Sequence, residues 1–376
     1  MTRPPLGHPQ LVDRIREEIR VSGPITFARF MELALHHPEH GYYAAGAGRL
    51  GERGDFITAS DLGPAFGRAV AQQVEELDRR LERPPSFDLI EIGAGRGLLA
   101  RDLLAALETS NQELHRRLRY TAVETSASMR GEIARVAPRV RVADAPPAAA
   151  TGCVLNVELF DALPVHRVVR RGGRLEEIGV GWDGERFHEV SIEPAGDVSA
   201  WAERYGAAAT EGFEAEVGLG LSGQIEAWDR AIERGFAFVL DYGDSAERLY
   251  SVERKRGTLM AYHAHRTGEA YLERVGEQDL TAHVNFTALT DAAAARGWRL
   301  AGRTTQDRFL IANGILEAFE TMDDRTYHDP EAIRQRQGIK RLIHPTGMGR
   351  MFQVWVYCKG LDTDPELAGL ADPFAR

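Results

Sequence analysis

Apolar residues recur at helical spacing in the first part of the chain and gather into short continuous runs after it. The helical spacing predicts helices over residues 9–20, from residue 27 and from about Pro64. Thr26 stands at the expected N-cap of the second helix. The glycine-rich residues 41–63 predict a long loop, and such loops inside compact proteins are usually functional or mobile.

Short apolar runs separated by helical segments follow Pro84-Pro85. Buried strands are predicted at 87–92, 119–124, 140–142, 153–157 and 236–240. Because these strands alternate with helices, we expect a parallel sheet with right-handed crossovers. Two further strands are predicted near the C-terminus, at 298–300 and 351–357.

The segment between the fourth and fifth strands is longer than one crossover helix needs. Its first part predicts hairpin strands at 165–169, 175–180 and 187–192. We therefore divide the chain into a helical region with a glycine-rich lid loop at 1–82, an α/β core at 83–166 and 234–360, an insertion covering the substrate side at 167–233, and a frayed tail at 361–376.

Composition narrows the class of protein. With 43% hydrophobic and 27% charged residues, the 376-residue chain is typical of a soluble globular protein, and no apolar run is long enough for a membrane span. The net charge of −10 disfavours wide nucleic-acid contact and suits a cationic partner. Cys153 and Cys358 lie in apolar, strand-like runs, which favours buried thiols. The N-terminus resembles neither a signal nor a transit peptide, so we expect a cytoplasmic protein; a homodimer remains open.

The most specific motif joins the first strand to the next helix. Glu91 is followed by a G-x-G-x-G pattern made by Gly93, Gly95 and Gly97. Glycine permits a tight turn at positive φ and lets a ligand approach the backbone. A dinucleotide fingerprint would instead need glycine at Leu98. The spacing therefore favours S-adenosyl-L-methionine (SAM) over NAD, with an ordinary strand-to-helix turn as the alternative.

An acidic residue, Glu124, also closes the second strand. Ligands of doubly wound sheets bind beyond the carboxyl ends of the strands, where Glu124 could accept hydrogen bonds from both ribose hydroxyls of SAM. A solvated strand cap is the alternative. Asp144, after the third strand, could accept a hydrogen bond from the adenine amino group or could be a plain turn residue.

Ordered motifs are spread over residues 24–360, at Gly54-Asp55-Phe56-Ile57-Thr58, Glu91 to Gly97, Val123-Glu124, Glu158 to Val165, Asp241-Tyr242-Gly243, Gly257-Thr258-Leu259, His283 to Phe286, Gln306, Phe309-Leu310 and Met348-Gly349. Together they resemble the MidA-like family, which includes the mitochondrial complex I assembly factor 7 methyltransferase. The resemblance implies a class I SAM-dependent methyltransferase: a Rossmann-like, doubly wound sheet with an antiparallel last strand. For the mitochondrial member it implies methylation of protein arginine.

The lid loop carries Asp55, Thr58 and Ser60, and the family motif there leads us to expect that it folds over SAM. A loop held together by side-chain turns is the alternative. We also count Val157, at the end of the fourth strand, among the cofactor-binding residues.

Two carboxylates just beyond the fourth strand, Glu158 and Asp161, are candidate catalytic groups. In methyl transfer from a sulfonium the protein mainly aligns the reactants, excludes water and removes a proton. Paired carboxylates suit a guanidinium acceptor because they can clamp its donors and offset its charge. Alternatively, Asp161 caps a turn and only Glu158 faces the site.

His263 and His265 are the candidate general bases. At positions i and i+2 they are expected to share one face of a strand. A metal pair would lack a third ligand, so no metal is expected. His283 is either a site residue or a structural histidine.

Two positions depart from the family pattern. Val157 stands where the family usually has asparagine, with Asn156 one place earlier, and His283 stands where it tends to have aspartate. Both changes remove polar groups from the expected substrate side. The acceptor is therefore a protein arginine or similar cationic nitrogen, or alternatively the oxygen or nitrogen of a small molecule. A SAM-binding assembly factor without catalysis is a third hypothesis.

Overall fold

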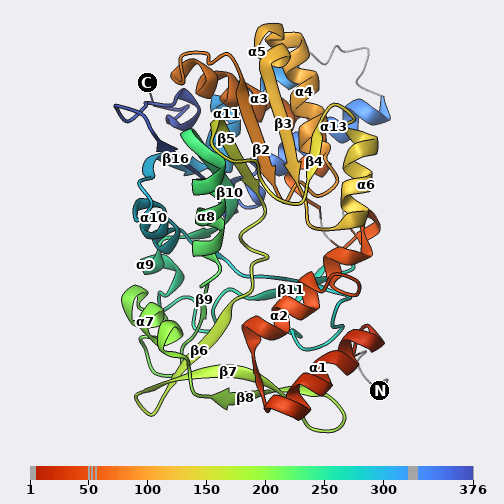
Figure 1. The fold of residues 1–376 in the computed structure, drawn as a ribbon, viewed down its shortest axis with the longest axis vertical. Helices are drawn as coiled ribbons and strands as arrows, with labels where there is room; N and C mark the ends of the chain where they lie inside the picture. The colour runs from red at the N-terminus through yellow and green to blue at the C-terminus, as the bar shows by residue number, and fades with distance from the viewer. Residues whose placement is uncertain (1–5, 50, 52–53, 56, 321–328, 376) are drawn as a thin grey trace. The chain divides into compact units, whose positions relative to one another are not determined.

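The computed structural model describes residues 6–49, 51, 54–55, 57–320 and 329–375. Among these residues, no helix is both long and apolar enough to cross a membrane. The chain forms two compact units, drawn in Figure 1. The first contains Met1–Phe56, Phe160–Gly223 and Gly243–Asp291, and the second contains Ile57–Leu159, Gln224–Tyr242 and Ala292–Arg376. Most of the predicted helical region and of the predicted insertion therefore falls in the same unit.

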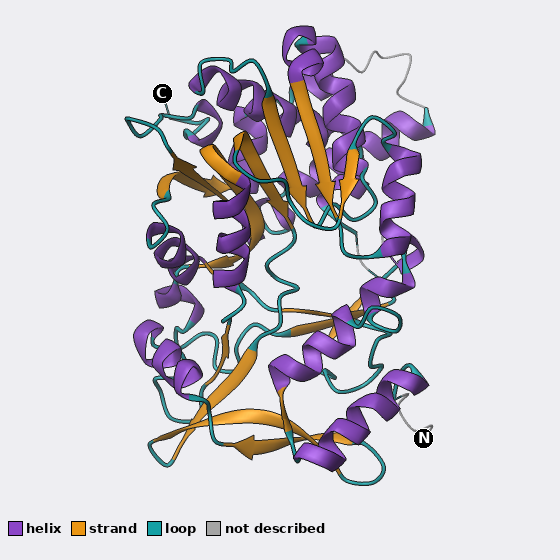
Figure 2. Cartoon of the chain, viewed as in Figure 1, coloured by secondary structure: helices purple, strands orange, loops and turns teal. Residues whose placement is uncertain are grey.

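The second unit is built on a mixed sheet, seen as the group of long strands in Figure 2. Its order is β15 (Arg299–Thr305), β16 (Phe352–Lys359), β10 (Ile232–Asp244), β5 (Ala150–Val157), β2 (Phe87–Ile92), β3 (Leu118–Val123) and β4 (Arg141–Ala143). The strands from β10 to β4 pair in parallel, whereas β16 is antiparallel to both neighbours. The predicted strands and the class I topology with an antiparallel last strand are thus confirmed.

Helices supply the apolar layer that covers this sheet. The helices of this unit are α3 (Pro64–Arg80), α4 (Leu98–Ser110), α5 (Gln112–Arg117), α6 (Ala127–Val136), α8 (Leu221–Ala231), which begins in the first unit, α11 (Gln306–Ala312), α12 (Glu317–Glu320), α13 (Pro330–Ile343) and α14 (Met348–Met351). Phe66 of α3 and Leu103 of α4 are fully buried against strand residues such as Leu89. At Gly67, an added Cβ would lie 2.6 Å from the Cβ of Asp102, so the close packing of α3 on α4 requires glycine.

The first unit combines short helices with two antiparallel sheets. Its helices are α1 (Pro9–Ser22), α2 (Phe27–His36), α7 (Gly196–Tyr205), α9 (Ala246–Leu249) and α10 (Phe286–Ala294), the last of which continues past this unit. One sheet has the order β1 (Ile25–Thr26), β7 (Arg174–Trp182), β6 (His166–Arg171) and β9 (Glu214–Val217), with β8 (Phe187–Ile192) on β7. The other joins β12 (Arg266–Gly268), β11 (Met260–His263) and β13 (Asp279–Thr281). The predicted hairpin strands are confirmed.

Local predictions about caps, thiols and the tail have mixed outcomes. The Thr26 side chain accepts a hydrogen bond from the Arg29 N–H at 3.1 Å, which confirms the N-cap. Cys153 and Cys358 are free and buried, as predicted. The tail was predicted to be frayed, and this is wrong for η5 (Ala368–Leu370): the buried Glu76 accepts hydrogen bonds from its first two backbone N–H groups.

Candidate functional site

The glycine loop leaves the carboxyl end of β2 as a turn at positive φ. Gly93, Gly95 and Gly97 have φ values of 74°, 53° and 75°. The N–H groups of Gly93 and Ala94 donate to the Val123 carbonyl at 2.9 and 3.3 Å, which ties the turn to the end of β3. A Cβ built on Gly95 would meet nothing within 4 Å. The requirement for glycine there is therefore conformational, and the turn faces open space that can receive a ligand.

Glu124 follows β3 and holds the glycine loop from its side. Its carboxylate accepts the Gly95 N–H at 3.0 Å and the Ser126 N–H at 2.8 Å. Burial raises the pKa of Glu124, while these backbone donors oppose the rise. A carboxylate can accept further hydrogen bonds beyond these two, so its chemistry fits a sugar diol. The expected contact with ribose stays a prediction, as does the role of Asp144, which is exposed just beyond β4.

Glu158 lies directly after Val157, the last residue of β5, in the left-handed region with φ of 53°. Its N–H donates to the Leu240 carbonyl at 2.9 Å, and its carboxylate accepts the Ala59 N–H at 2.8 Å. A non-glycine residue in this conformation costs energy, and such residues cluster at functional sites. The strand end thus presents one predicted catalytic carboxylate to the lid segment.

The part of the lid in the second unit includes the short helix η3 (Ala59–Leu62), which contains the predicted Ser60. Thr58 caps it in a capping box with Asp61: the Asp61 carboxylate accepts the Thr58 N–H at 2.9 Å and its hydroxyl at 3.0 Å. Arg96, between two loop glycines, forms an ion pair with the same carboxylate. Our sequence reasoning missed Asp61 and Arg96, although an acid three residues after a threonine is the signal of a capping box.

Glu91 is set behind the loop, in the core. Its side chain is buried, and the Tyr120 hydroxyl donates to it at 2.7 Å. Burial raises the pKa of Glu91 to about 7, with a smaller contribution from the charge of Glu124. The cofactor contact of Glu91 stays a prediction, and its hydrogen-bond partner Tyr120 belongs to the apolar cluster of the sheet.

Asp55, the remaining lid residue, belongs to the first unit. Its carboxylate accepts the Tyr42 hydroxyl at 3.0 Å and the Ala264 N–H at 2.7 Å, and it lies 3.5 Å from Nδ1 of His263. Its carbonyl accepts the His265 N–H at 3.0 Å. Asp55 therefore joins η1 (Tyr42–Ala45) to the turn after β11. Phe56, between Asp55 and the second unit, lies outside the described residues.

The prediction that His263 and His265 share one face of a strand is wrong. His263 is the last residue of β11, whereas Ala264 and His265 form the turn to β12 with φ of 49° and 60°. Period-two alternation holds only while the backbone stays extended. The i, i+2 spacing alone could not reveal the turn.

Of the other predicted residues in the first unit, Asp161 is buried and His283 is partly buried. Asp161 is 6% exposed and its carbonyl accepts the Ala282 N–H. Asp279, which sequence reasoning missed, accepts the Tyr43 hydroxyl at 2.9 Å, and burial raises the pKa of its carboxyl to about 7. His283 lies 3.0 Å from the Arg254 guanidinium, and burial lowers its pKa to about 4. The contact with Arg254 and this low pKa support the structural interpretation of His283.

Asn156, one place before the position where the family usually has asparagine, has a structural role in this chain. Asn156 is fully buried on β5, where it accepts from the Trp228 indole at 3.2 Å and donates to the Phe238 carbonyl at 3.1 Å. Successive strand residues point to opposite faces. The amide of Asn156 therefore does not replace the side chain that Val157 lacks.

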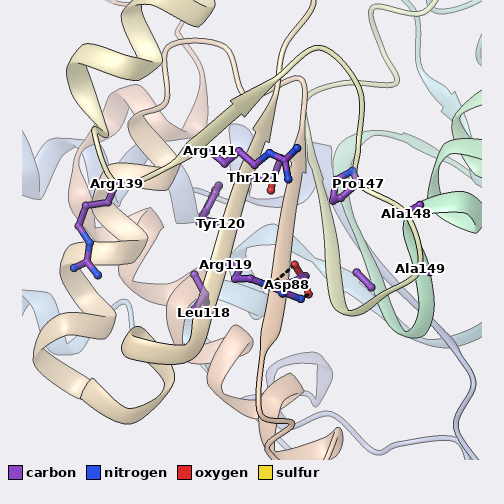
Figure 3. A pocket seen from close by; sticks show the side chains of 11 residues that line it. Asp88, Leu118, Arg119, Tyr120, Thr121, Arg139, Arg141, Pro147, Ala148 and Ala149 are labelled. Carbon is purple, nitrogen blue, oxygen red and sulfur yellow. Dashed lines mark hydrogen bonds and ion pairs between the residues drawn. The ribbon is translucent and has the colours of Figure 1, made fainter.

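A separate cleft lies at the amino ends of the parallel strands. It has a volume of about 490 Å³ and is lined by residues such as Asp88, Arg119 and Arg141, near the starts of β2, β3 and β4. Figure 3 shows Arg119 reaching Asp88, and it labels Pro147 and Ala148 of the β4–β5 connection, which also line the cleft. The glycine loop follows the opposite end of β2, so this cleft is not the cofactor site.

Comparisons with known proteins agree with the prediction, made from the glycine loop, that the chain binds SAM. A model of the family described as "Putative S-adenosyl-L-methionine-dependent methyltransferase" matches residues 65–304. A crystal structure from Burkholderia thailandensis bound to S-adenosyl-homocysteine is 31% identical, covers 98% of both chains and superposes with a TM-score of 0.88. The "Protein arginine methyltransferase NDUFAF7 homolog, mitochondrial" of Drosophila melanogaster is 27% identical over 92% of this chain and 84% of its own. The mouse protein, also 27% identical, aligns with 89% of this chain and 81% of its own.

Proposed function

Because the chain belongs to the family of S-adenosyl-L-methionine-dependent methyltransferases, we propose that its methyl acceptor is the guanidinium group of a protein arginine. The cofactor, SAM, follows from the family, and the prediction of SAM over NAD is confirmed. The described residues fit SAM: the three loop glycines have positive φ, and Gly95 faces open space beside the Glu124 carboxylate.

Glu158 is the observation that carries the proposal. It places a carboxylate immediately beyond β5, on a strained backbone, at the same edge of the sheet as the glycine loop. Bringing a guanidinium to a sulfonium sets two positive charges against each other, and a fixed carboxylate offsets this repulsion. Relatives along most of the chain that are named protein arginine methyltransferases support the same acceptor. Asp161, the other predicted carboxylate, belongs to the other unit, so the proposal rests on Glu158 alone.

The proposed chemistry is an in-line displacement. SAM supplies an electrophilic methyl group, and transfer forms a nitrogen–carbon bond, breaks the sulfur–carbon bond and releases one proton and S-adenosyl-homocysteine. Glu158 accepts hydrogen bonds from the guanidinium and holds one nitrogen in line with the methyl group. Gly95 and Glu124 fix the glycine loop on which that alignment depends.

The acceptor class can be tested with methyl-labelled SAM and host lysate. The proposal predicts label in protein, recovered as methylarginine after acid hydrolysis. Label confined to small molecules would contradict it. The absence of transfer by a protein that binds SAM would favour the assembly-factor hypothesis instead.

Two substitutions at Glu158 separate its charge from its contact with the lid. Glutamine keeps an oxygen that can accept the Ala59 N–H, whereas alanine loses it. We expect Glu158→Gln to keep SAM affinity within a few-fold while turnover falls by roughly two orders of magnitude. Glu158→Ala should weaken SAM binding as well. The exposed Glu203→Gln is the matched control, and near wild-type turnover of Glu158→Gln would rule out the guanidinium clamp.

A small-molecule O- or N-acceptor is the second candidate. The polar side chain that the family usually has at the end of β5 is missing at Val157. The Asn156 amide already forms hydrogen bonds with Trp228 and Phe238. A neutral acceptor needs less negative charge and more help from a base such as His263. In that case a His263→Ala variant should lose more turnover than Glu158→Gln.

A further inference from the structure

Asp61 is the meeting point of the lid and the glycine loop. Its side chain is 4% exposed and accepts both hydrogen bonds of the Thr58 cap on one oxygen, while its other oxygen pairs with Arg96. The Arg96 side chain is 23% exposed. An ion pair this shielded from solvent is screened much less than a surface pair.

Arg96 connects η3 to the glycine turn through its ion pair with Asp61. It is flanked by Gly95 and Gly97, both at positive φ, and Gly97 is the N-cap of α4. Glu158 holds the other end of the same segment through the Ala59 N–H. The short helix is therefore attached to two neighbouring strand ends by charged groups, at the edge of the sheet where the cofactor binds.

We propose that Asp61 and Arg96 are positioning residues whose ion pair latches η3 onto the glycine turn and thereby slows the release of S-adenosyl-homocysteine. Neither side chain is required to touch the cofactor. Opening η3 requires the pair to separate, and separation leaves a shielded carboxylate without its cation. The inference concerns the cofactor alone, so it stands whichever acceptor the enzyme uses.

The test measures the binding kinetics of S-adenosyl-homocysteine without any acceptor. Asp61→Asn keeps an oxygen for the Thr58 cap but loses the charge, and Arg96→Gln removes the cation. We expect each to raise the dissociation rate constant at least tenfold and to change the association rate constant less than threefold. The double variant should dissociate within threefold of the faster single variant, because both changes break one interaction. Asp364→Asn, which breaks the exposed pair with Arg299, is the matched control.

A second readout uses the protein without ligand. Hydrogen exchange at the amides of Thr58 and Ala59 should speed up in Asp61→Asn and Arg96→Gln but not in the control. Arg96→Lys, which keeps a point charge, should restore slow dissociation in part. Unchanged dissociation in both single variants, or multiplied effects in the double variant, would overturn the latch. Because these experiments involve no methyl transfer, failure of the arginine proposal would not affect them.

Discussion

At the scale of single residues, Glu91 should make the free energy of unfolding of the second unit depend on pH, and the direction of this dependence can be predicted. The folded protein keeps the Glu91 proton up to a pKa of about 7, whereas the unfolded chain loses it near 4.5. Between these values the folded state binds the extra proton, so the free energy of unfolding falls as pH rises from about 4.5 to about 7. Above about pH 7 the proton on Glu91 no longer contributes to the free energy of unfolding.

Glu91→Gln should remove this slope. Glutamine carries no charge and can still accept the Tyr120 hydroxyl. We expect wild type to lose on the order of 2 kcal/mol more than the variant between pH 4.5 and 7, measured by urea unfolding. Asp279 titrates over a similar range in the first unit, so the informative quantity is the difference between the two profiles. Parallel profiles would show that Glu91 titrates normally.

The positions of residues in the fold were predictable from the sequence where a strand end fixed them, although the roles of these residues stay predictions. Glu124 and Glu158 follow parallel strands, so their positions at one edge of the sheet follow from alternation of strands and helices. His265 was misplaced because nothing in its neighbours signals the left-handed turn. The Asp61–Arg96 pair joins positions 35 residues apart, and no local pattern encodes that contact.

At the scale of elements, the N-cap of α2 offers a simple check. Thr26→Ala removes the acceptor of the Arg29 N–H and should lower the free energy of unfolding by about 1 kcal/mol. Thr26→Ser should preserve most of the stabilisation by the cap, because serine caps helices equally well. Denaturant unfolding of the three proteins measures the difference. Equal losses in the serine and alanine variants would mean that the methyl group, not the cap, is responsible.

Most elements were predictable because their apolar patterns are strong. The runs at 87–92 and 187–192 coincide with β2 and β8, and the predicted strand at 236–240 lies inside the longer β10. The pairing of strands was harder to predict from the sequence. The two residues of β1 become a strand only through their partners in β7, Val180 and Gly179. Such short strands exist because of distant contacts and carry no periodicity of their own.

At the scale of the whole molecule, ligand binding should stabilise the second unit. At a concentration one hundred times the dissociation constant, S-adenosyl-homocysteine should add about 2.7 kcal/mol to the unfolding free energy. Replacing Trp182 and Trp201 of the first unit by phenylalanine leaves the three tryptophans of the second as fluorescent probes. Their thermal transition should move upward with ligand. An unchanged transition at saturation would place the cofactor outside this unit.

The division into units was the part of the fold least accessible from sequence. Each unit is assembled from three separate stretches of chain. Composition and periodicity describe neighbouring residues, whereas the membership of Phe160–Gly223 and Gly243–Asp291 in one unit depends on contacts between distant segments. The sequence did indicate an insertion, because the connection after the fourth strand was too long for one helix.

The two buried cysteines make the molecule a convenient subject for thiol labelling. Both thiols are buried, and burial raises the pKa of both, so maleimide dyes will react with them slowly. A donor and an acceptor dye can therefore be attached through two new cysteines, at the exposed Arg174 of one unit and Thr363 of the other, without removing the native ones. Energy transfer between the dyes would then report the arrangement of the two units in solution, before and after S-adenosyl-homocysteine is added.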